Sequence, residues 1–172
     1  MKKILLIIFV SFLTLSSLFA QNSRTESNFT SRKNALGFSS NSLSNFGLTY
    51  RHHFNDFAIQ PNFAFSISDF EEKWEGGVNF LYFLRYDERT ALFVYQLNTI
   101  QYRKYKNVYD YYPGYYYDNS TSEYLDWTNS AGFGFQLQFG ECISLDLMYG
   151  LGYYSEFEVF TLSGGFALMY YF

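Results

Sequence analysis

Two adjacent histidines, His52 and His53, are the residues of this 172-residue chain whose types best suit acid–base or metal chemistry. They end an alternating segment that stops before Asn55 and Asp56. Adjacent residues of a strand point to opposite faces, so the two imidazoles cannot hold one metal ion between them. We therefore expect His53 to be an interior polar residue and His52 an interface residue, and we predict no catalytic site and no cofactor.

Acidic and sulfur ligands add little to this chemistry. Asp69, Glu71 and Glu72 could bind a cation, but a solvated charged loop is the commoner origin of such a cluster. Cys142 is the only cysteine, so the chain has no internal disulfide framework. The formal charge is −4 and becomes −6 once Lys2 and Lys3 are removed. A mildly acidic chain argues against nucleic acid as a partner.

A tyrosine-rich segment at residues 103–121 is the strongest candidate for recognition. Tyrosine combines a large contact area with a polar tip, which suits a binding surface. An aromatic girdle continuing above a membrane, or two strands extending beyond it, would explain the same composition. The candidate contact residues are Tyr105, Tyr109, Tyr111, Tyr112, Tyr115, Tyr116 and Tyr117.

The elements that position these residues begin after an export signal. Residues 1–20 combine Lys2 and Lys3, an apolar run from Ile4 to Leu18, and small Ala20 before the expected cut, which indicates a secretory signal peptide. The run is shorter than the ~20 residues that a spanning helix needs. Residues 21–33 are polar and aperiodic and are predicted to form a flexible leader.

Residues 34–172 contain segments with a period of two, the periodicity of a β-strand. In the fifth segment we assign Ala91, Phe93, Tyr95, Leu97 and Thr99 outward and Gln96 and Asn98 inward, although a bulge or another register would also fit its mixed faces. Connections after the second, fourth and sixth segments are tight, and those after the third, fifth and seventh tend to be longer. The predicted strands are residues 34–39, 45–54, 57–67, 74–86, 90–102, 122–139, 142–154 and 159–172.

One large apolar face per strand, together with 24% aromatic residues and no long apolar run, favours strands that cross a membrane. Backbone groups in hydrocarbon must pair within the protein, so the sheet must close. The sequence thus predicts an all-β fold, an eight-stranded antiparallel up-and-down transmembrane β-barrel. A soluble β-sandwich is the competing class, but its strands are usually shorter.

Charges on the predicted inward faces need partners, because burying an unpaired charge is costly. Arg51, Arg85 and Asp146 lie toward the periplasmic ends of their strands, where we predict a buried polar network. Glu75 and Asp126 lie near the opposite rim, where water can reach them.

The last strand carries large apolar residues at alternate positions that end at the carboxyl terminus, namely Phe166, Leu168, Tyr170 and Phe172. This pattern resembles the C-terminal β-signal of bacterial outer-membrane proteins, which implies recognition by the barrel-assembly machinery. The mature chain resembles small eight-stranded barrels of the OmpX and OmpA-transmembrane type. Its Tyr- and Asn-rich strands and Gln21 are similar to those of the Bacteroidetes-type outer-membrane β-barrel family. We expect no peptidoglycan-binding domain to follow the barrel.

Three functions are compatible with these patterns. The first is a non-enzymatic outer-membrane barrel with a filled interior, acting through extracellular loops or as a structural envelope component. The second is a narrow pore for small solutes, and the third a lipid-modifying enzyme, for which both histidines lie at the wrong rim. The expected partners are outer-membrane lipid or lipopolysaccharide and, through residues 103–121, an extracellular ligand or protein.

Overall fold

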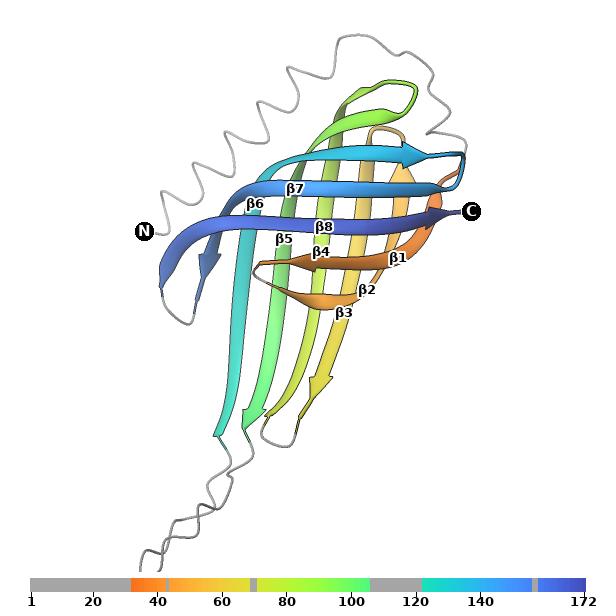
Figure 1. Cartoon of the computed structure of the whole chain (residues 1–172). Helices are drawn as coiled ribbons and strands as arrows, with labels where there is room; N and C mark the ends of the chain where they lie inside the picture. Colours follow the sequence, from red (N-terminus) through yellow and green to blue (C-terminus); the bar gives the residue numbers. More distant parts are fainter. Residues whose placement is uncertain (1–31, 43, 69–70, 106–121, 156–157) are drawn as a thin grey trace, which may run out of the picture.

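A computed structural model describes residues 32–172 except 43, 69–70, 106–121 and 156–157. Each strand pairs antiparallel with the next, and β1 pairs with β8, so the sheet closes into a barrel (Figure 1). The predicted all-β, eight-stranded antiparallel barrel is confirmed. The strands are β1 (Asn34–Asn41), β2 (Ser44–Phe54), β3 (Phe57–Ile67), β4 (Glu71–Tyr86), β5 (Thr90–Tyr105), β6 (Ser122–Phe139), β7 (Ile143–Tyr154) and β8 (Val159–Tyr171).

Burial alternates along the strands because successive side chains point into the lumen and out of the barrel. The outward residues are large and apolar on every strand, and we call this surface the apolar belt. A search of the described residues for an apolar helix long enough to cross a membrane finds none. Belt residues include Leu36, Phe38, Phe46, Leu48, Phe63, Phe80, Leu92, Phe133, Phe135, Leu147, Leu151, Leu162, Phe166 and Leu168.

The barrel has two unlike rims. The terminal rim holds both ends of the described chain and the turns at residues 55–56, 87–89 and 140–142. Asn55 and Gly140 adopt φ of 56° and 65° there, a left-handed conformation suited to tight turns. Asp56 O and Arg89 O accept hydrogen bonds of 2.8 Å from the neighbouring strands, which secures the turns to the sheet.

The opposite, loop rim carries the remaining connections. The segment between β5 and β6 is long, but the one after β3 comprises only residues 68–70. This differs from the predicted longer connection, because Glu71–Lys73 extend β4 by pairing with β3 and β5. The predicted charged loop is therefore largely strand.

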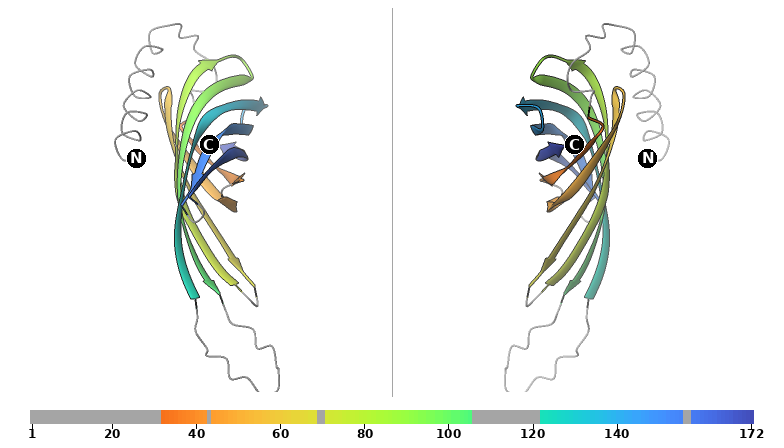
Figure 2. Two further views of the ribbon diagram at one scale, coloured as in Figure 1. Left: turned by 90° about the vertical axis from the view of Figure 1, so that its left-hand side faces the viewer. Right: turned by 90° about the vertical axis from the view of Figure 1, so that its right-hand side faces the viewer.

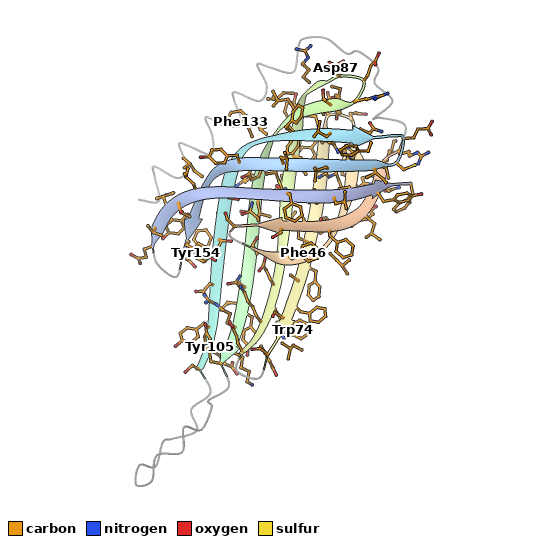
Figure 3. All side chains as sticks on the ribbon, viewed as in Figure 1. Phe46, Trp74, Asp87, Tyr105, Phe133 and Tyr154 are labelled. Atoms are coloured by element: carbon orange, nitrogen blue, oxygen red, sulfur yellow. The ribbon has the colours of Figure 1, made fainter. Side chains whose placement is uncertain are left out.

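Strands β3 to β6 continue past the rest of the barrel at the loop rim (Figure 2). β6 pairs with β5 from Ser122 onward, but it pairs with β7 only from Thr128. We call the part of β3–β6 that lies beyond β2 and β7 the protruding sheet. In Figure 3, Trp74 and Tyr105 lie at its far end and Asp87 lies at the other end of the molecule.

The structure reverses the predicted faces of β5. Phe93, Tyr95 and Leu97 are at most 4% exposed and point inward with Ala91 and Thr99. Antiparallel pairing sets this orientation, because Phe93 lies opposite Phe83 and Tyr95 opposite Leu81, both inward residues of β4. Gln96 and Asn98, which were predicted to face the lumen, therefore belong to the outer surface.

Pro61 occupies a regular place in β3 opposite Val78 of β4. On the β2 side the register is the same before and after Pro61. Between these regular pairs, however, Tyr50 is not paired with Pro61 and Arg51 is not paired with Gln60. Proline has no N–H to donate to a ladder, so a missing bond is expected at this position, and no register shift accompanies it.

Candidate functional site

Arg51 of β2 is the centre of a buried polar cluster in the half of the lumen near the terminal rim. Its guanidinium donates to Gln60 Oε1 at 2.9 and 2.5 Å and to the Tyr171 hydroxyl at 3.1 Å. It also forms an ion pair with Asp146 of β7, and both side chains are completely buried. Bonds to several acceptors offset the cost of removing this cation from water.

The cluster continues through Gln136 of β6 and Tyr171 of β8. Gln136 Nε2 donates to the Tyr171 hydroxyl at 2.7 Å and to Ser144 Oγ at 2.8 Å. Because the Tyr171 oxygen accepts from Arg51 and Gln136, its proton is directed to His53 Nε2, 3.3 Å away. His53 therefore accepts through Nε2, and the cluster links strands β2, β3, β6, β7 and β8.

Large apolar side chains fill the lumen beside this cluster. The Phe83 ring packs between those of His53 and Phe93 in tilted contacts, with ring centroids 5.1 and 5.3 Å apart. An eight-stranded barrel leaves an interior that side chains can fill. We call this group the apolar plug, and it comprises Ala58, Leu81, Phe83, Ala91, Phe93, Tyr95, Leu97 and Met148.

Arg85 does not join the cluster predicted for it. Leu84 forms a bulge against β5, which shifts the pairing between Phe83 and Arg85 by one residue. An extra residue in one strand reverses which side chains face the lumen. Arg85 is consequently exposed, and Tyr86 instead packs against Phe83 with ring centroids 5.2 Å apart.

The structure places the two remaining predicted charges at the loop-rim half of the lumen. Glu75 accepts a hydrogen bond of 3.0 Å from Gln101, and Asp126 pairs with Arg103 at 2.5 Å. Sequence reasoning missed Arg103, although it continues the inward set of β5 once that strand has its observed orientation. It also missed Gln60, Gln136 and Tyr171 as partners of Arg51, because hydrogen-bond partners on distant strands depend on register.

The protruding sheet carries exposed aromatic and charged side chains on both faces. Tyr105 and Tyr124 continue the lumen-facing sides of β5 and β6, whereas Lys104 and Glu123 lie on the outer face. Tyr105 and Tyr124 meet edge to face with centroids 5.7 Å apart, and Lys104 pairs with Glu123 at 3.5 Å. Tyr105 lies in β5 and is exposed. The other predicted contact residues lie outside the described part of the chain, namely Tyr109, Tyr111, Tyr112, Tyr115, Tyr116 and Tyr117.

The remaining candidates for chemistry are separated from one another. His52 faces outward and contacts Asn34 Oδ1 at 2.8 Å, whereas His53 faces the lumen. Cys142 is a free thiol whose sulfur accepts from Arg32 at 2.6 Å, and Arg32 also bonds the Tyr171 carbonyl. Among the described residues no group of three potential metal ligands occurs. Asp69 lies outside them, and Glu71 and Glu72 are in β4.

Comparisons with known proteins find similarity of fold. No family model matches the chain, and no curated protein sequence does. The structure is similar to Ail, the attachment invasion locus protein of Yersinia pestis, with 15% identity, a TM-score of 0.45 and coverage of 81% of this chain and 94% of Ail. It is similar to the N-terminal β-barrel domain of Pseudomonas aeruginosa OprF, with 10% identity, a TM-score of 0.49 and coverage of 80% and 96%.

A third similar structure is Neisserial surface protein A, with 12% identity, a TM-score of 0.43 and coverage of 80% of this chain and 90% of that protein. At 10–15% sequence identity, the roles of individual residues in these proteins cannot be transferred to this chain.

Proposed function

We propose that this protein is a non-enzymatic integral barrel of the bacterial outer membrane that acts at the cell surface through its protruding sheet. The apolar belt supports the membrane location, because contiguous apolar surface of this extent marks a lipid or protein contact. With an exported chain cut after Ala20, the terminal rim would face the periplasm and the loop rim the exterior.

The observation that carries the binding role is the exposed edge of β6 beyond the barrel. Residues 122–126 pair with β5, but within the described residues no β7 segment lies on their other side. A free strand edge can accept an added strand, while alternate side chains supply specificity. Tyr124 lies in this edge and Tyr105 is opposite Ser122, and the tyrosine-rich residues 106–121 directly precede the edge in the sequence. A protein, a glycan or lipopolysaccharide is the class of partner that such a surface suits.

The test compares the full mature protein with a variant in which a short turn joins Ile100 to Trp127, which face each other in the sheet, so that the edge at residues 122–126 is removed. Both should fractionate with the outer membrane and show a heat-dependent gel shift, because the turn leaves the barrel intact. Cells that display the full protein should attach to surfaces or to other cells, and cells with the shortened variant should not. Equal attachment would reject the binding role, and a soluble protein without a gel shift would reject the barrel in the membrane.

The narrow pore remains a second candidate because polar residues line the lumen toward the loop rim, among them Thr49, Thr99, Thr128, Ser130 and Ser163. The apolar plug and the Arg51 cluster would block the passage of solutes from this polar part of the lumen to the terminal rim. Planar-bilayer recording separates the two functions: a filled barrel gives no discrete conductance, and a pore gives steps. The enzyme alternative has no support from the described residues, whose histidines lie on opposite faces near the terminal rim.

We further propose that the barrel-assembly machinery recognises the last strand. Phe166, Leu168, Tyr170 and Phe172 are all exposed on the outer surface of β8 and just beyond it. They form a continuous apolar row that ends at the terminal rim, which would be the side from which periplasmic factors approach.

A further inference from the structure

A hollow interrupts the apolar belt on the outer surface of β4, β5 and β6. Its cavity volume is about 440 Å³. A side chain added at Gly76 would meet no atom within 4 Å, so the floor of the hollow is open to the outside. The walls are apolar, because Ile100 of β5 lies beside Gly76 and Trp127 of β6 lies beside Ile100. The lining residues are Gly76, Gly77, Val78, Asn98, Thr99, Ile100, Trp127 and Thr128.

Two carboxamides meet at one side of this hollow. Asn129 of β6 donates a hydrogen bond to Asn98 Oδ1 of β5, and the two residues are directly opposite each other in the sheet. Gln96 lies on the same outer face of β5 and is half-buried. Polar side chains are therefore grouped on a surface whose other members are apolar.

The depth of this polar group within the belt makes it unusual. On β5 it lies between Leu92 and Tyr102 and nearer to Tyr102, which places it within the apolar band and toward the loop rim. In hydrocarbon, an amide without a partner is costly. The bond between the two asparagines uses one oxygen and one nitrogen, so the Asn98 nitrogen and the Asn129 oxygen still require partners.

We propose that the hollow is a binding site for a lipid whose acyl chain is attached through an amide. The acyl chain would lie over Gly76 and along Ile100 and Trp127, which line the hollow. The amide of the lipid would accept from the Asn98 nitrogen and donate to the Asn129 oxygen. An ester-linked chain has no N–H and can satisfy only one of the two groups. The site is independent of the binding role of the protruding sheet.

Trp127 provides the measurement, because bromine on a lipid chain quenches a tryptophan that it contacts. The chain has two tryptophans, so Trp74→Phe leaves Trp127 as the only reporter. This variant of the mature protein is refolded into vesicles of brominated phosphatidylcholine. A small mole fraction of unbrominated ceramide, which has an amide-linked chain, is compared with diacylglycerol, whose chains are ester-linked.

One additional hydrogen bond of about 1 kcal/mol corresponds to a preference of about five-fold. Ceramide should therefore displace brominated lipid and restore Trp127 fluorescence at a mole fraction about five-fold lower than diacylglycerol requires. Adding Gly76→Leu should remove the effect of ceramide by filling the hollow. Gly164→Leu is the matched control, because Gly164 also lies on the outer face, of β8, and its added carbon would meet only Met148 O at 3.9 Å.

The double substitution Asn98→Leu with Asn129→Leu tests the polar half of the site separately. It should leave the hollow and reduce ceramide to the potency of diacylglycerol. Equal potency of the two lipids in the unsubstituted site would overturn the proposal, as would a ceramide effect that persists with Gly76→Leu. A dimer that Gly76→Leu abolishes would instead assign the hollow to a second copy and reject the lipid. The heat-dependent gel shift confirms that each variant has folded.

Discussion

Arg51 illustrates how much a single buried side chain matters in a barrel whose lumen is filled. It bonds Gln60, Asp146 and Tyr171 from three other strands and has no contact with solvent. A buried ion pair contributes little compared with an apolar pair of the same volume, but removing one member leaves an unpaired charge. The two charges should therefore behave very differently when they are removed singly and together.

We predict that Arg51→Met lowers the free energy of unfolding by about 3–5 kcal/mol, because Asp146 then has no cation. Adding Asp146→Leu should recover most of this loss. Urea unfolding in detergent micelles, followed by tryptophan fluorescence, measures both. The matched control is Arg85→Met, which is expected to change stability by no more than about 0.5 kcal/mol because Arg85 is exposed. If Arg85→Met were as costly as Arg51→Met, the bulge at Leu84 would be contradicted.

Arg51 and Arg85 also show when the alternation of residues along a strand correctly predicts that a side chain faces the lumen. Counting in steps of two assigns Arg51 to the lumen because β2 pairs with β1 in an unbroken register from Gly47 to His52. The same counting fails at Arg85, because no residue type in Phe83, Leu84 and Arg85 signals a bulge. Arg103 was missed for another reason, since it was assigned to the tyrosine-rich segment 103–121 and not to β5.

At the scale of elements, β5 shows that a period of two identifies the two faces of a strand but does not tell which face points into the lumen. Both faces of β5 carry large apolar residues, and the polar Gln96 and Asn98 favoured the wrong face for the lumen. Its observed orientation depends on long-range pairing, in which Phe93 lies between Phe83 of β4 and Gly134 of β6. β6 was predicted with its observed bounds, because its apolar and small residues separate cleanly onto two faces.

Gly134 tests this packing directly. An added β-carbon there would lie 2.1 Å from the Phe93 ring, which is fully buried. We predict that Gly134→Ala lowers the free energy of unfolding by about 1–3 kcal/mol through overpacking. Combining it with Phe93→Leu should cost less than the sum of the two single changes, because the smaller side chain makes room for the methyl group.

Urea titrations of the wild type, both single variants and the double variant complete this cycle. Gly76→Ala serves as the control glycine, since its added carbon meets nothing within 4 Å and the change should cost little. Strict additivity would mean that Phe93 does not pack on Gly134, and the inward orientation of β5 would then lose its support.

At the scale of the whole molecule, closure depends on the pairing of β1 with β8, which are far apart in sequence. The final residue takes part, because Phe172 N donates to Asn34 O at 2.9 Å. The number of strands followed from the sequence, whereas the protruding sheet did not. Its cause is the unequal length of neighbouring strands, and β4 and β5 gain their extra residues from segments that were expected to be loop.

Phe172 also tests assembly separately from stability. Phe172 and Phe139 are 57% and 56% exposed, and both lie at the terminal rim. If assembly factors recognise the terminal residue, Phe172→Asp should reduce insertion in cells far more than Phe139→Asp. Purified protein refolded in detergent should show similar yields for both. Equal insertion in cells would contradict recognition of the last strand.

The seam itself can be blocked without changing a charge or an apolar contact. An added β-carbon at Gly37 of β1 would lie 1.9 Å from the backbone oxygen of Leu168 in β8. Backbone cannot move aside as a flexible side chain can, so Gly37→Val should force the seam strands apart and leave β1 and β8 as open edges. We predict loss of the heat-dependent gel shift and rapid proteolysis. Gly164→Val, also in a seam strand but with an open outer face, should keep both properties of the closed barrel. If Gly37→Val folds as well as Gly164→Val does, then β1 and β8 do not close the sheet in the observed register, because that register places the Gly37 position against Met169.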